Sequence, residues 1–291
     1  MASIYKIPGY TLVLMGAFFL SWGGLLIREW EGGDIWQILF WRSFFFSSTL
    51  ILFLYFIYKK KAFSIIKKSG FPGVFGGIAA AVGFIAYVFA MSTTTVANVL
   101  FIISTQTIWL ALFGYLFLKE KISLKTLLSI ILAMVGILVM VSGSLSTGSL
   151  FGNLVALFIP INFAFLILLI RKYVNLDLVP ALFYGGLIIL FFSFFMSETV
   201  MVSKHDLIVG FLLGSFQHAF GFVCIVIGAR STPAVVVGLL MLSETLLGPF
   251  WVWLFLSEIP PISVFIGGSI IILAVIVKTL EQKYSNASKS N

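Results

Sequence analysis

The sequence predicts an all-α integral membrane protein whose ten transmembrane helices form two inverted five-helix repeats. Three observations predict this fold. Hydrophobic residues make up 61% of the 291 residues and charged residues only 10%, against roughly 25% charged residues in an ordinary soluble domain. The apolar residues form runs of about 20, the length that spans a hydrocarbon core roughly 30 Å thick. Short motifs of the first half also recur, in order, in the second half.

Each apolar run is interpreted as one helix, because backbone groups in lipid must bond within their own segment and the sequence shows no barrel-like alternation. The first run lacks a small-residue cleavage site followed by a polar region, so it is interpreted as a membrane helix and not as a signal peptide. In the ninth run, Thr232-Pro233 indicates a helix start and Gly248-Pro249 a local break. The runs begin near residues 9, 34, 70, 95, 124, 150, 178, 207, 233 and 261.

The positions of the basic residues predict the orientation in the membrane. If the N-terminus is cytoplasmic, all Lys and Arg residues except Arg28, Arg42 and Lys204 fall in cytoplasmic loops or the tail, as the positive-inside rule requires. We therefore expect a multi-pass protein of the cell (inner or plasma) membrane with both termini in the cytoplasm. The same clustering accounts for the net charge of +8 without a nucleic-acid partner.

An internal repeat is indicated by matches at a nearly constant spacing. "LFLKE" at 116–120 recurs as "LFLSE" at 254–258, and "LLIR" at 25–28 recurs at 168–171. Residues 1–146 are predicted to form the first repeat, and residues 147–291 the second repeat with a short polar cytoplasmic tail. Because five spans is an odd number, the second repeat must enter the membrane from the opposite side. Inverted repeats are typical of carriers that hold their substrate near the midplane.

Two longer stretches carry a family resemblance: "AMSTTTVANVLFIISTQTIWLALFGYLFLKEKIS" at 90–123 and "ARSTPAVVVGLLMLSETLLGPFWVWLFLSEIPP" at 229–261. With the doubled five-span unit, they resemble the EamA-type members of the drug/metabolite transporter (DMT) superfamily. The resemblance implies a ten-helix secondary transporter that moves small metabolites such as amino acids or amines, or drugs, often outward. The chain departs from the family pattern at Gln106-Thr107, where Asn-Pro is usual, and at Thr245, where Pro is usual.

Polar residues of several spans are predicted to meet at one depth. Glu244 follows Pro233 by eleven residues, which places it about 16 Å into a core of roughly 30 Å. Polar groups at this depth are costly against lipid, so they are expected to face protein or water. Spans one, two, four, six, eight and nine should therefore surround a central site, and spans five and ten should lie apart from it. The predicted substrate-binding residues are Glu244, Arg42, Gln106, Gln217, His218, Trp22, Asn162, Trp109 and Ser21.

Glu244 is the candidate proton-coupling residue, because a carboxylate in the membrane interior is expected to bind a substrate cation or to exchange a proton. Structural roles stay open for the others. The amides and Ser21 can bond one helix to another, His218 can be a neutral core histidine, and the tryptophans can simply pack. Arg42 and Glu244 can also form a static buried ion pair.

The predicted function is secondary active transport of small polar metabolites, with amino acids or organic amines expected first, by alternating access around the midplane site. The alternatives are a multidrug or organic-cation exporter and, in a different class, a passive channel or a structural membrane subunit. The expected partners are a small-molecule substrate, the lipid bilayer and protons as coupling ion. A homodimer through the lipid-facing span near 124 or near 261 is a further expectation.

An enzyme is not expected, because the sequence has no G-x-S-x-G, no H-E-x-x-H and no carboxylate pair at helical spacing in the membrane. The single cysteine, Cys224, excludes a disulfide within the chain and a cysteine metal cluster. No metal and no cofactor are expected.

Overall fold

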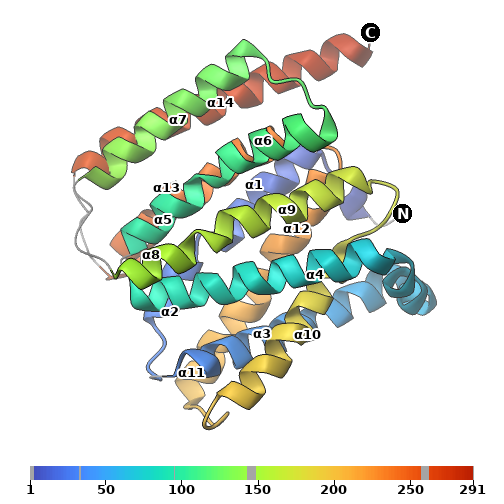
Figure 1. Ribbon diagram of the computed structural model, residues 1–291, viewed down its shortest axis with the longest axis vertical. Coiled ribbons are helices and arrows are strands. Elements are labelled where there is room, and N and C mark those ends of the chain that lie inside the picture. The colour runs from blue at the N-terminus through green and yellow to red at the C-terminus, as the bar shows by residue number, and fades with distance from the viewer. Residues whose placement is uncertain (1–2, 33, 95, 143–148, 257–261, 291) are drawn as a thin grey trace.

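The computed structural model describes residues 3–32, 34–94, 96–142, 149–256 and 262–290, and every regular element in these residues is a helix (Figure 1). The predicted all-α membrane fold is confirmed, since 7 stretches of the described residues are long and apolar enough to cross a membrane. One of them, Ile35–Thr93, contains two helices, and shorter apolar helices cover Leu124–Val139 and Phe265–Val277. The exact number of ten spans stays a prediction.

The first half contains helices that begin close to the predicted positions. Within α4 the backbone leaves helical geometry at Gly70 (φ 50°, ψ −145°), a conformation that glycine adopts without steric cost, and Pro72 follows in the next turn. The span predicted near residue 70 therefore starts at this kink. The elements are η1 (Ser3–Lys6), α1 (Gly9–Leu20), α2 (Gly23–Arg28), α3 (Ile35–Tyr58), η2 (Lys59–Lys61), α4 (Ala62–Thr93), α5 (Val96–Ser104), α6 (Gln106–Leu118) and α7 (Leu124–Ser142).

The second half confirms the helix start predicted at Pro233, because α13 begins at Ala234. The local break predicted at Gly248-Pro249 is wrong, since α13 continues through Pro249. Proline removes one backbone donor, which membrane helices tolerate where their surroundings satisfy the freed groups. The elements are α8 (Leu150–Ala156), α9 (Phe158–Lys172), α10 (Val179–Met196), α11 (Lys204–Phe211), the π-helical segment η3 (Leu212–Ala219), α12 (Phe220–Ala229), α13 (Ala234–Leu256) and α14 (Ile262–Ser290).

The helix contacts form a pattern that exchanging the two halves would leave nearly unchanged. α1 packs against α12 as α9 packs against α4, and α6 packs against α9 as α13 packs against α1. Two further contacts, α7 with α14 and α6 with α13, join equivalent helices of the two halves. An internal repeat predicts this pattern. The repeat itself and its inverted orientation stay predictions.

α7 and α14 lie side by side at one edge of the bundle, while α3, α10 and α11 lie at the opposite edge (Figure 1). The contacts of α7 and α14 with other helices are chiefly with α5 and α13. Between the two edges, α12 lies against α1, and it carries the buried free Cys224. The centre of the bundle is therefore built without α7 and α14.

Gly214 allows η3 to approach the backbone of α3 closely near the centre of the bundle. A Cβ atom on Gly214 of η3 would collide with the backbone oxygen of Arg42 and would lie 2.9 Å from the backbone nitrogen of Phe46. Small residues let membrane helices approach to backbone contact in this way. Gly214 thus sets the distance between η3 and α3, the two elements that carry His218 and Arg42.

Candidate functional site

A cavity lies between the two halves at the centre of the bundle. It offers about 50 Å³ to the centres of water molecules, room for a few waters, because one water needs roughly 10–15 Å³ by this measure. The elements that line it are α1, α3, α4, α5 and α6 of the first half and α9, η3, α12 and α13 of the second. Its lining residues are Leu20, Arg42, Ala79, Ala80, Gly83, Phe84, Tyr87, Ile103, Gln106, Ile159, Asn162, Phe163, Leu166, Gln217, His218, Phe222, Met241 and Glu244.

Six of the nine predicted site residues line this cavity, and the other three do not. Trp251 explains the position of two of the three: its Nε1 donates to Ser21 Oγ at 2.8 Å, and its ring stacks on Trp22 with 4.3 Å between centroids. Trp109 packs near Phe113, with 6.1 Å between ring centroids. The six that line the cavity are Glu244, Arg42, Gln106, Asn162, Gln217 and His218.

Regular α-helical geometry is interrupted at or next to five of the nine predicted site residues. Gln217 and His218 lie in the π-helical segment η3, a type of irregularity that is frequent at functional sites. Gln106 directly follows the break between α5 and α6 at Thr105, and α1 ends just before Ser21 and Trp22. The sequence alone did not indicate the π-helical segment, since its residues are compatible with an ordinary helix.

Arg42 and His218 form the closest polar contact of the cavity. Arg42 NH2 lies 2.6 Å from His218 Nδ1, and because a guanidinium only donates hydrogen bonds, Nδ1 is the acceptor. The guanidinium also lies over the ring of Tyr87, 5.3 Å from its centroid. The other two guanidinium nitrogens, Nε and NH1, are buried with no hydrogen-bond partner among the described residues.

Glu244 reaches the same cavity from α13 and is only 7% exposed. Among the residues that the structure describes, the ion pair found is between Arg171 and Glu120. The alternative of a static Arg42–Glu244 pair is therefore not seen here, because Arg42 is bonded to His218 instead. A basic and an acidic side chain thus line one cavity without forming an ion pair with each other.

The side-chain amides of the cavity make some hydrogen bonds within the protein, and others of their polar atoms have no partner in the described residues. Gln217 Nε2 donates to the Leu20 backbone oxygen at 3.1 Å, a bond between helices, and Asn162 Nδ2 donates to the Phe158 oxygen of its own helix at 2.8 Å. Gln217 Oε1 and Gln106 Nε2 are buried without a partner in the described part of the chain. The structural interpretation of these amides is therefore correct for some of their atoms and leaves others unexplained.

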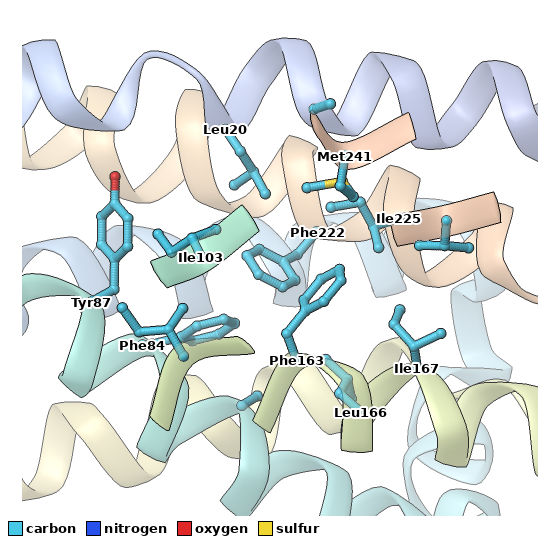
Figure 2. Packing of buried hydrophobic residues seen from close by; sticks show 14 of the residues in the cluster. Leu20, Phe84, Tyr87, Ile103, Phe163, Leu166, Ile167, Phe222, Ile225 and Met241 are labelled. Carbon is cyan, nitrogen blue, oxygen red and sulfur yellow. The ribbon is translucent and has the colours of Figure 1, made fainter. Parts of the chain in front are cut away.

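α4, the third of the predicted spans, lines the cavity, although the sequence prediction did not place this span at the central site. It contributes mostly small and aromatic residues, and among its lining residues only Tyr87 carries a polar side-chain atom. The run "GGIAAAVGF" at 76–84 could have indicated that this span borders a cavity, since small residues leave space between helices. Figure 2 shows Phe84 and Phe163 near Phe222, and the rings of Phe84 and Phe222 meet edge to face at 4.5 Å.

One end of the bundle is joined by Glu120. Its Oε1 accepts from Arg171 Nε at 3.0 Å and NH2 at 2.8 Å, and its Oε2 accepts from the backbone N–H of Ala234 at 2.9 Å. The end of α9 and the start of α13 are thereby bonded to the second residue beyond α6. At this end Tyr5 Oη also donates to Asp177 Oδ2 at 2.6 Å, and burial followed by the negative charge of Asp177 raises the pKa of Tyr5. Tyr5 therefore stays a neutral donor.

The opposite end is joined by bonds that link the α2–α3 connection and α3 to the α10–α11 connection and α11. The backbone N–H of Glu31 donates to Asp206 Oδ1 at 2.9 Å, and Trp41 Nε1 donates to the Val200 oxygen at 2.9 Å. Gln37 Nε2 donates to the oxygens of Thr199 and Met201 at 3.0 and 3.2 Å. Both ends of the bundle are therefore linked across the two halves of the chain.

Apolar helices that enclose a cavity with buried charges define a multi-pass membrane protein with an internal site. Residues 7–142 match the EamA-like transporter family. The resemblance drawn from the sequence is therefore confirmed by this match, which covers most of the first half of the chain. The class of protein is a membrane transporter.

Two known proteins are similar over almost the whole chain. An uncharacterized transporter of Clostridium kluyveri is 22% identical over 307 residues, which cover 97% of this chain and 96% of that protein. A solved crystal structure superposes with a TM-score of 0.78 at 15% identity, covering 95% of this chain and 98% of the other. At this identity the second similarity shows the fold alone.

The described residues contain no group of three or more His, Cys, Asp or Glu side chains that could hold a metal ion. The side chains that line the cavity offer a guanidinium, a carboxyl group, an imidazole, amides and aromatic rings.

Proposed function

We propose that the chain is a secondary active transporter that moves small polar metabolites, amino acids or organic amines, by alternating access around the central cavity. The observation that carries this proposal is that a basic and an acidic side chain, Arg42 and Glu244, line one central cavity without forming an ion pair with each other. Buried charges are costly unless they are partnered. A polar solute would supply the missing partners.

The packing of the helices supports alternating access. Equivalent contacts recur in the two halves, as between α1 and α12 and between α9 and α4. Two related halves can exchange conformations, which gives inward-open and outward-open states of similar free energy around one site. The narrow cavity of this structure admits only a few waters, so a solute enters when one end of the bundle opens.

The lining favours a carrier over a channel. Channels typically present rings of like residues, whereas the polar side chains of this cavity differ from helix to helix: a guanidinium from α3 (Arg42), carboxamides from α6 and α9 (Gln106 and Asn162) and a carboxyl group from α13 (Glu244). An asymmetric site of this kind binds one solute in one orientation.

Flux in proteoliposomes tests the proposal. Purified protein is reconstituted, and uptake of labelled amino acids and amines is measured with and without an imposed proton gradient, using empty liposomes as control. A carrier gives saturable uptake and counterflow, the exchange of labelled external solute for unlabelled internal solute. Flux that rises linearly with concentration and shows no counterflow would indicate a channel. Absence of any flux across a broad metabolite panel would contradict the proposal.

A further inference from the structure

One nitrogen of the Arg42 guanidinium has a hydrogen-bond partner, and the other two have none among the described residues. Arg42 is 3% exposed, and its NH2 is bonded to His218. Its Nε and NH1 are buried without a hydrogen-bond partner in the described residues. Buried donors without acceptors are rare in folded proteins and call for an explanation. The cavity that Arg42 lines is the place where an acceptor can enter.

His218 holds the guanidinium in this arrangement. Its ring is surrounded by Phe84, Phe46 and Phe222, with centroid distances of 4.1, 4.5 and 4.9 Å, so the ring is fixed in place. Nδ1 accepts from Arg42, which places the proton of the neutral imidazole on Nε2. His218 thus accepts a hydrogen bond from one nitrogen of Arg42. Because the imidazole is neutral, it leaves the positive charge of the guanidinium uncompensated.

The missing partner is therefore an anion with two acceptor atoms. A carboxylate matches the planar guanidinium, because its two oxygens can accept from the remaining N–H of NH2 and from the adjacent N–H of either NH1 or Nε. No carboxylate of the described residues lies within ion-pair distance of Arg42, since the described ion pair joins Arg171 to Glu120. The empty acceptor position is thus left for a solute.

We infer that Arg42, positioned by His218, is the carboxylate-binding residue of the cavity, so that the solute must carry a carboxylate. This inference rests on the proposed function and narrows it, because amino acids satisfy the requirement and simple amines do not. Glu244, which lines the same cavity without contacting Arg42, is then left to bind the ammonium group of the same solute. Arg42 contacts the solute, and His218 acts through Arg42 as a positioning residue.

Ligand binding to the wild-type protein is the first test and needs no variant. The probes are the twenty common amino acids and matched amines that lack only the carboxylate, such as leucine with isopentylamine and phenylalanine with phenethylamine. A ligand that binds the folded state raises the melting temperature. The inference expects shifts from one or more amino acids and none from their amines. It is overturned if an amine shifts the melting temperature as much as its amino acid, or if no amino acid does so.

Variants then separate the two roles. Arg42→Gln can still donate to His218 Nδ1 but loses the charge, and it should weaken binding of the active amino acid by about a hundredfold, as for a charged hydrogen-bonded contact. His218→Phe keeps an aromatic ring but cannot accept a hydrogen bond from Arg42, so it should raise the KM for the active amino acid about tenfold. His218→Asn can accept this bond and should retain most of the affinity for the same amino acid. Unliganded melting temperatures report whether each variant is folded. Unchanged amino-acid affinity in folded Arg42→Gln overturns the inference.

Failure of the inference and failure of the proposed function give different results. Saturable flux of an amine that Arg42→Gln leaves unchanged overturns the carboxylate requirement and leaves the transporter proposal intact. Absence of saturable flux for every compound contradicts the transporter proposal itself.

Discussion

Glu244 is a carboxylate among side chains that give it no ionic partner. It lines the cavity with three other titratable residues, Arg42, Tyr87 and His218. The described residues show no ion pair between Arg42 and Glu244, and the cation is instead bonded to a neutral imidazole. A carboxyl group in this position can change its protonation state without breaking a salt bridge, which is what coupling of a solute to protons requires.

Glu244→Gln tests this role. The substitution preserves the shape and hydrogen-bonding capacity of the side chain but removes the titratable charge, so transport should lose its dependence on pH while the melting temperature changes little. Initial uptake rates in proteoliposomes between pH 5 and 8 provide the measurement. Glu198→Gln is a matched control, because Glu198 is exposed and outside the cavity. Normal transport with an unchanged pH profile in Glu244→Gln would make Glu244 a structural polar contact.

The sequence predicted the polar residues of the cavity better than its apolar ones. Glu244, Arg42 and His218 were identifiable because a polar side chain at membrane depth is costly and needs a reason. Phe84 and Tyr87 were not, because an aromatic residue in a membrane helix is equally compatible with packing or with a lipid-facing surface. Trp22 was predicted to face the site, but its direction around the helix depends on tertiary packing against Trp251, which no local pattern encodes.

At the scale of single elements, Glu120 connects the end of α6 to the start of α13, the helix that carries Glu244. The carboxylate accepts from the α13 N-terminus and from Arg171, at side-chain exposures of 15% for Glu120 and 21% for Arg171. Anions are favoured at helix N-termini. This end of the cavity cannot open between α6 and α13 while both bonds persist.

Glu120→Gln should therefore favour opening at this end, because loss of the charge weakens a mostly buried pair by about 1–3 kcal/mol. A cysteine at Met241, which lines the cavity one turn from Glu244, reports the opening in a Cys224→Ser background. Its reaction with a small maleimide should become about fivefold or more faster with Glu120→Gln, within the range that this energy allows. Glu198→Gln serves as control, and equal rates in both variants would show that Glu120 does not hold this end closed.

Element boundaries were predictable where the chain changes chemistry. Asp34 precedes α3 and accepts from the Trp36 N–H at 2.8 Å, and Pro233 precedes α13, so both starts follow known capping preferences. The continuous course of α13 through Pro249 was not predictable, because a membrane helix tolerates proline when its surroundings compensate. The π-helical geometry of η3, which packs against α3, was not predictable either, because its residues are compatible with an ordinary helix.

For the whole molecule, the orientation in the membrane is the prediction on which the inverted repeat depends. Reporter fusions at residue 65, beyond the lysine cluster 59–61, and at residue 32, between α2 and α3, should report opposite sides of the membrane. Residue 65 is expected in the cytoplasm and residue 32 outside. The same side for both fusions would contradict the ten-span topology and, with it, the inverted relation of the two halves.

The rate at which the thiol of Cys224 reacts with a reagent can report the unfolding of the protein. The only thiol of the chain is 5% exposed and lies on α12 where that helix packs against α1. A fluorogenic thiol reagent should therefore react slowly while the helices stay packed and rapidly once they separate, without any engineered label. Because α1 and α12 come from opposite halves, the reaction rate reports how long the two halves stay together, which is the lifetime of the folded molecule in a given detergent or lipid.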